Sequence, residues 1–299
     1  MNHFILFLIG LLFFSSHSLN DLDKNMSVIS IPEYKDQLKG FWLGQCIANM
    51  TGLVTEMDKI GNIGEIKTGK FYTSNDWGKL DEPNIFSPNQ ISEYSETIDF
   101  VFEQDGVWPA DDDTDIEYMY QDLLLKNKTS FLTPTQIRSG WMKHIKIEEE
   151  NFLWVSNQKA FDLMKEGVLP PETSDPNLNE HYEMIDAQLT TEIFGFLAPS
   201  RPDIALKMAE LPILTTARYD AKWISQFYVS MYSLATTIDT KKDIKYNILT
   251  IADKSRYLLP ETSYSSKMYD YVKGQYLEGK SWEEACLLYT SDAADDKQC

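Results

Sequence analysis

The sequence is poor in cysteine, in histidine and in positive charge. Three cysteines in 299 residues are too few for a disulfide-built scaffold, and four histidines do not suit a histidine-rich zinc site. The 27 lysines and arginines face 46 aspartates and glutamates, so the net charge is −19. This balance argues against nucleic acid or an anionic membrane surface as the partner, because both need clustered basic residues. The 43% hydrophobic content excludes a disordered acidic chain.

Long apolar runs are also scarce, and the one that stands out is at the N-terminus. Residues 4–14 (FILFLIGLLFF) have about the length of a signal-peptide core, and Ser16 and Ser18 give the small-x-small pattern of a cleavage site. The sequence therefore predicts a signal peptide over 1–18 and an exported protein, periplasmic or secreted, without stable membrane insertion after cleavage. An uncleaved anchor is the alternative, because His3 is the only residue before the run that could carry a positive charge.

The C-terminal end differs in character from the rest. Residues 286–296 (CLLYTSDAADD) resemble one reading frame of the transposase adapter used to prepare sequencing libraries. We therefore expect 286–299 to be an artefact and 19–285 to be an incomplete native domain. An acidic tail is the alternative interpretation. Without the tail only Cys46 remains, which excludes an internal disulfide.

Helical periodicity dominates, and strand-like alternation is scarce, so the predicted class is all-α with a single domain. The segment 57–109 is rich in Gly, Asn, Asp and Pro and is expected to be loop with one helix near 91–103. Thr114 and Glu117 have the spacing of a capping box, which predicts a helix start there. Gly40 and Gly44 would allow a neighbour to approach closely. The other expected helices cover residues 33–51, 134–146, 156–166, 183–198, 203–210, 220–236 and 264–278.

The most informative motif is an acidic run at that helix start. Asp111, Asp112 and Asp113 follow one another directly and precede a further acid after Thr114. Carboxylate oxygen is the ligand that magnesium prefers, and three successive carboxylates repel one another unless a cation neutralises them. The alternative is that acids at a helix N-terminus only complement the helix dipole.

Three stretches together resemble the ADP-ribosylglycohydrolase family. Residues 40–56 (GFWLGQCIANMTGLVTE) are similar to the glycine-spaced N-terminal helix of that family, in which G-D-A-L-G is followed by a Glu. The acidic run is similar to the family's T-D-D-T metal motif, and 184–205 is similar to its central region. The resemblance extends over about 35–285, with the motifs in the same order.

This resemblance implies an orthogonally packed multi-helix domain around a two-magnesium centre. Asp111, Asp112 and Asp113 would form the first half of the metal site, and Glu56 would be the catalytic acidic residue near the scissile bond. The implied reaction is hydrolysis of a ribosyl glycosidic bond in an ADP-ribosyl or nucleoside-type small molecule. Asn49 falls on the Asp of G-D-A-L-G, and it is expected on the substrate side of the site.

The chain departs from the family pattern in ways that favour a divergent subfamily. Asp111 replaces a Thr, Asn49 replaces an Asp, and residues 216–220 lack a His that often binds substrate there, for which Asp220 is the polar substitute. The family's second metal motif, of the G-D-x-D-T type, is absent up to residue 285. We therefore expect this chain to bind magnesium weakly or not at all and to be inactive. A secreted, non-catalytic binding protein on the same fold is the alternative to an enzyme.

Overall fold

The computed structural model describes most of the chain from residue 111 onward and selected segments before it. The described residues are 28–55, 59, 62–63, 66–68, 72–81, 83, 98, 111–146, 153–282 and 284–286, with the backbone alone at 50, 53–55, 62–63, 66 and 74. The chain divides into two units, residues 1–37 and 38–299. The expected signal peptide, Glu56 and nearly all of the expected helix at 91–103 and of the C-terminal tail lie outside the described residues.

The described structure is helical, which confirms the all-α class. Its extended structure is one antiparallel pair of two-residue strands, β1 (Asn62–Ile63) and β2 (Ile66–Lys67). Short 3-10 turns occupy Ser74–Asp76, Glu172–Ser174 and Arg256–Leu258. The helices are α2 (Ile31–Thr55), α3 (Asp112–Asn127), α4 (Pro134–His144), α5 (Val155–Lys165), α6 (Asp186–Thr190), α7 (Ile193–Leu197), α8 (Pro202–Ile213), α9 (Tyr219–Ala235), α10 (Ile244–Ser255) and α11 (Tyr264–Leu277).

Local sequence explains where several of these helices begin. At α4, Thr133 and Gln136 form a reciprocal capping box, and Pro134 occupies the first helical position, where its missing N–H costs nothing. Asp243 accepts hydrogen bonds from two backbone N–H groups at the start of α10, and Ser263 caps α11 in the same way. These caps satisfy N–H groups that have no partner within the helix.

Three expectations about helix boundaries are corrected. The capping box at Thr114 is wrong, because α3 begins earlier, with Asp111 as its N-cap, and Glu117 points into the protein. The single helix expected over 183–198 is two short helices, α6 and α7, separated by two residues. Helix α10 has no counterpart among the expected helices.

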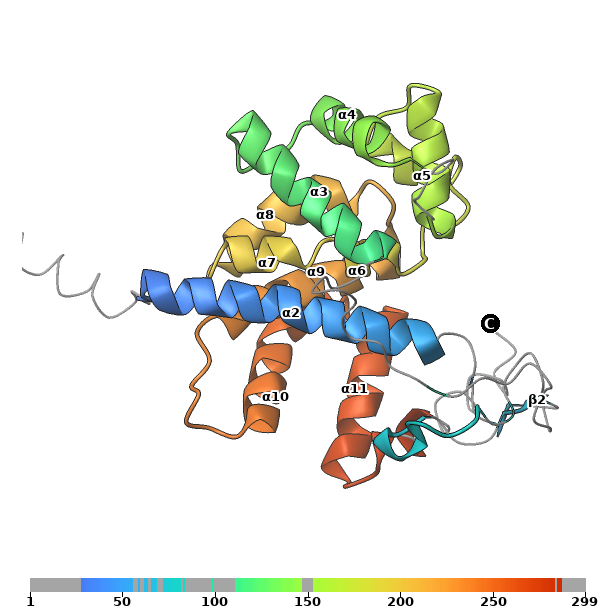
Figure 1. Ribbon diagram of the computed structural model, residues 1–299, viewed down its shortest axis with the longest axis vertical. Helices are drawn as coiled ribbons and strands as arrows, with labels where there is room; N and C mark the ends of the chain where they lie inside the picture. Colours follow the sequence, from blue (N-terminus) through green and yellow to red (C-terminus); the bar gives the residue numbers. More distant parts are fainter. Residues whose placement is uncertain are drawn as a thin grey trace, which may run out of the picture. The chain divides into compact units, whose positions relative to one another are not determined.

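Helix α9 is the main packing partner within the second unit. It packs against α6, α7, α8, α10 and α11, while α3 packs against α4 and α6. Figure 1 shows α10 and α11 on one side of α9 and α7 and α8 on the other. The contact between α7 and α9 is close, because a Cβ built at Gly195 would lie 2.5 Å from the Val229 carbonyl oxygen. The core includes fully buried Trp141, Tyr120 and Phe194.

Within the second unit, Phe41 of α2 contacts aromatic rings of α7 and α9. The Phe41 ring lies 4.6 Å from that of Phe196 and 5.5 Å from that of Tyr232, measured between centroids. No described atom lies within 4 Å of a Cβ built at Gly40 or Gly44, so the close approach expected there is not found among the described residues. Across the described ranges, no helix has both the length and the hydropathy needed to span a bilayer.

Candidate functional site

The acidic run forms the first turn of α3. Asp111 is the N-cap with an extended backbone, and Asp112 and Asp113 are the first helical residues. All three side chains are only partly exposed, whereas Asp115 faces solvent. The Asp111 side chain makes no capping hydrogen bond to its own helix. Backbone N–H groups of Thr114 and Asp113 still interact with this carboxylate and partly offset the rise that burial causes in its pKa.

Asn49 of α2 is joined to this acidic turn. Its Nδ2 donates to Asp111 Oδ1 at 2.6 Å and to the Thr114 hydroxyl oxygen at 2.5 Å. Two regions that the sequence singled out separately, 40–56 and 111–115, thus meet in the fold. The amide fixes the orientation of the Asp111 carboxylate by direct contact.

A further carboxylate, Asp186, reaches the same region from α6. The backbone N–H of Trp154 donates to Asp112 Oδ2 at 3.3 Å, and that of Asn157 donates to Asp186 Oδ1 at 3.0 Å. Both donors belong to the start of α5, so the two carboxylates approach the same end of that helix. Asp186 is 2% exposed, and its Oδ2 has no hydrogen-bond partner among the described residues.

The pKa of Asp113 is raised by its burial and by the neighbouring carboxylates. Burial, followed by the negative charges of Asp111, Asp112, Asp186 and Glu192, raises its pKa to about 8. Burial likewise raises the pKa of Asp111 and of Asp112. The four strongest charged neighbours of Asp113 are thus all carboxylates. A cation at this position would relieve the repulsion.

Next to this turn, Glu117 and Glu192 form a buried pair of carboxyl groups. Gln45 Nε2 donates to Oε2 of both side chains, and Glu117 Oε1 accepts from the Ile193 backbone N–H at 2.7 Å. Burial raises the pKa of Glu192 to about 7. Burial, followed by the charge of Glu192, raises the pKa of Glu117 well above its ordinary value. Burial and mutual repulsion make the two carboxyl groups, which an amide and not a cation bridges, costly to ionise together.

The remaining expected site residues do not join this cluster in the described structure. Glu56 lies outside the described residues. Asp220, in the first turn of α9, accepts a hydrogen bond from the Ser265 backbone N–H at 2.8 Å, which ties the start of α11 to α9. Its neighbour Tyr219 has a left-handed backbone, φ 46°, an uncommon conformation for a residue other than glycine. Backbone strain of this kind is concentrated at functional sites.

The carboxylates suit a hard divalent cation by donor chemistry and by charge. Oxygen donors are what magnesium prefers, and the mutual repulsion of Asp111, Asp112 and Asp113 is what a cation removes. In the part of the chain that the structure describes, no three carboxylate, imidazole or thiolate groups converge as the ligands of one ion. The described residues thus offer oxygen ligands for a cation but not a complete coordination shell.

Glu117, Asp186, Glu192 and Gln45 were not foreseen from the sequence. A usable signal exists for two of them. Glu117 stands in the buried stripe of α3 between Ile116 and Met119, and Glu192 directly precedes the apolar segment of α7. A charged residue where the periodicity demands an apolar one indicates a buried polar group with a specific partner.

Comparisons with protein-family models, with curated proteins and with solved structures found no match to this chain.

Proposed function

We propose that the chain belongs to a magnesium-dependent hydrolase of a ribosyl glycosidic bond, with an ADP-ribosyl or nucleoside-type small molecule as substrate. The observation that carries the proposal is the carboxylate cluster around Asp113, whose charge is uncompensated in the described structure. A structural role alone would favour fewer acids or a basic partner, because each buried like charge costs free energy.

In this proposal Asp111, Asp112 and Asp113 hold magnesium through their carboxylate oxygens. When bound, the ion would polarise a water and the ribose hydroxyls. The chain's own residues orient these ligands: Asn49 fixes Asp111, and the Trp154 N–H fixes Asp112. Glu56, by its resemblance to the family's acidic residue, would accept or donate the proton at the scissile bond.

A non-catalytic binding protein is the second candidate, and one contact favours it. The Asn49 side-chain nitrogen is already bonded to Asp111 and Thr114, so it is engaged in holding the turn and not in contacting a substrate. A protein that keeps the fold and binds the cation without turnover would need Asn49 only to hold the acidic turn in place.

Substitution of one carboxylate tests the enzyme proposal. Asp112→Asn is expected to lower the magnesium-dependent release of ADP-ribose or a related nucleotide by about 100-fold or more, because it removes a charged ligand. The assay uses a gene product that continues beyond residue 285, since the second metal motif is expected there. Asp115→Asn is the matched control, because Asp115 belongs to the same turn but is exposed. Equal rates for Asp112→Asn and wild type would refute the role of this carboxylate.

Calorimetric titration of magnesium separates the two candidates and tests the 299-residue chain. Stoichiometric, micromolar binding by this chain would contradict the expectation that it binds weakly or not at all. Binding by the longer product without turnover of any ribosyl substrate would favour the binding protein. Loss of binding in Asp112→Asn but not in Asp115→Asn would support the metal site under either candidate.

A further inference from the structure

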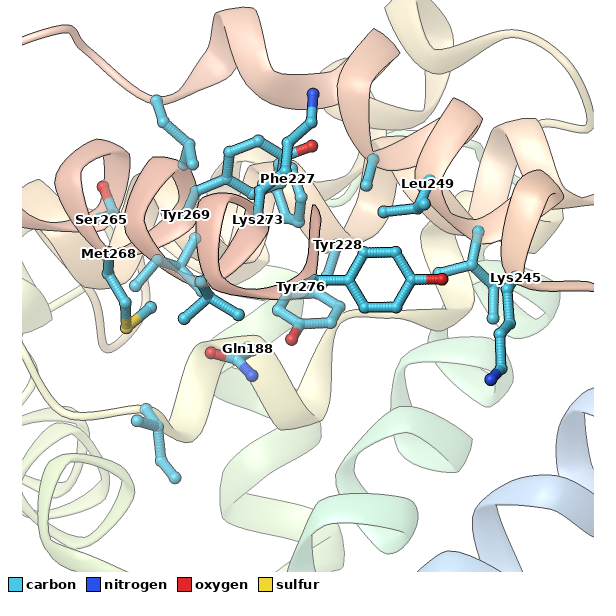
Figure 2. A pocket seen from close by; sticks show the side chains of 16 residues that line it. Gln188, Phe227, Tyr228, Lys245, Leu249, Ser265, Met268, Tyr269, Lys273 and Tyr276 are labelled. Carbon is cyan, nitrogen blue, oxygen red and sulfur yellow. The ribbon is translucent and has the colours of Figure 1, made fainter. Parts of the chain in front are cut away.

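A large cavity lies on the side of α9 away from α7 and α8. It has a volume of about 730 Å³ and is enclosed by α6, α9, α10 and α11 (Figure 2). This volume falls within the range of roughly 300–1,000 Å³ that is typical of small-molecule sites. None of the carboxylates of the acidic turn lines it.

Most of the side chains that line the cavity are apolar, both at its base and at its rim. Phe227, Ala252 and Leu259 form a buried base. At the rim, Ile248 and Val272 are 49% and 45% exposed, although both are large and apolar. Apolar side chains that are gathered around a concavity and left in water indicate a surface that binds an apolar group.

The charged side chains that line the cavity are of one sign. Among its 16 lining residues are two lysines and no aspartate or glutamate, in a chain whose net charge is −19. Lys273 pairs with Asp253, which offsets its charge. The described lysine ion pairs do not include Lys245, which lies at the edge of the cavity in Figure 2. Lys245 therefore offers an available positive charge beside an apolar space.

Polar groups without charge lie elsewhere around the cavity. Figure 2 shows Gln188 and Tyr276 together on a different side from Lys245. Ligand pockets of this kind combine apolar walls with a few polar groups that fix the orientation of the ligand. The arrangement suits a molecule with an extended apolar body and one acidic end, and the absence of acidic lining residues disfavours a cationic one.

We propose that this cavity binds an amphipathic monoanion of the long-chain carboxylate class, with its hydrocarbon body between α10 and α11 and its acid group at Lys245. The apolar area removed from water provides the affinity, and the lysine selects the anion. The proposal is independent of the function proposed for the acidic turn, because it uses none of the same residues.

The proposal is tested by titration with dodecanoate below its micelle concentration. Dodecanol and dodecyltrimethylammonium serve as the neutral and the cationic analogue. Wild type should bind dodecanoate more tightly than either analogue. Lys245→Met should weaken dodecanoate binding about fivefold and leave dodecanol binding unchanged, because it removes charge but keeps apolar length. Lys254→Met on the same helix is the matched control, since Lys254 is exposed and does not line the cavity.

A second variant keeps the test decisive if the charge effect is small. Ile248→Glu places an acid on the exposed rim, where folding tolerates it, and should weaken dodecanoate binding by about tenfold or more. Equal binding of the three probes by wild type, or unchanged dodecanoate binding in both variants, would overturn the proposal. A concentration-dependent dimer that Ile248→Glu dissociates would also overturn it, because a second copy would then cover the cavity.

Discussion

Asp113 and Glu117 lie one helical turn apart on α3, and both are carboxyl groups that burial makes costly to ionise. For each, burial has a larger effect on the pKa than any neighbouring charge. They differ in their partners: Glu117 accepts from Gln45 and Ile193, whereas the strongest neighbours of Asp113 are other carboxylates. The hydrogen bonds give Glu117 a structural role, and the repulsion leaves Asp113 suited to a cation.

Replacement of Glu117 separates loss of charge from loss of hydrogen bonds. Because burial and the charge of Glu192 raise the pKa of Glu117, we expect Glu117→Gln to cost less than about 1 kcal/mol of unfolding free energy, since an amide can still accept from Ile193. Glu117→Ala should cost about 3 kcal/mol or more, because it leaves a cavity and removes the acceptor of the Ile193 N–H. Urea unfolding at pH 7 measures both. Equal losses in the two variants would mean that the carboxyl is ionised in the folded protein.

At the scale of elements, the contact between α7 and α9 depends on the absence of a side chain. A Cβ at Gly195 would meet the Val229 carbonyl oxygen at 2.5 Å and the Ser233 nitrogen at 3.0 Å, both backbone atoms of α9 that cannot move independently. Gly195→Ala should therefore lower the unfolding free energy by about 3 kcal/mol or more. Chemical denaturation followed by circular dichroism measures this, and a wild-type midpoint would contradict it.

The matched control is Gly274→Ala in α11. A Cβ at Gly274 meets no described atom within 4 Å, so the substitution adds helix propensity without a clash. It should raise the unfolding free energy by about 0.5–1 kcal/mol. The same substitution, glycine to alanine, is thus expected to change the unfolding free energy in opposite directions at the two positions.

Most helices with an apolar stripe or a cap were predicted from the sequence, but one of them was not. Helices α4, α5 and α9 lie close to their expected ranges. Helix α10 was not predicted, although its sequence is amphipathic and Asp243 precedes it as a cap, so a usable signal was present there. The join between Asn49 and the acidic turn needs tertiary packing, which spacing along one chain does not reveal.

On the scale of the whole molecule, negative charge is both abundant and locally concentrated. The chain carries a net charge of −19, and the region around Asp113 gathers carboxylates from α3, from α6 and from Glu192. Charge on the exposed surface is screened by salt, whereas charge in a partly buried cluster is screened much less. The pH dependence of stability should therefore depend on the cluster more than on the net charge.

The unfolding temperature is expected to fall as the pH rises from about 4 to about 8. Asp113 has a pKa of about 8 in the folded protein against an ordinary value of 3.8, so in this window the folded state binds a proton that the unfolded state does not. Stability then decreases with pH and is fully present below the ordinary pKa. Asp113→Asn stays uncharged at every pH and should flatten the curve, with a gain of about 2 kcal/mol or about 5 °C at pH 8.5.

Differential scanning calorimetry in EDTA, which removes divalent cations, measures this slope for wild type and Asp113→Asn. Glu183→Gln is the control, because Glu183 is exposed and the substitution removes the same formal charge. If net charge governed stability, the two variants would shift the curve equally. If the cluster governs stability, only Asp113→Asn flattens the slope between pH 4 and pH 8. In a wild-type chain with a complete metal site, added magnesium should then raise the unfolding temperature at the alkaline end of this range.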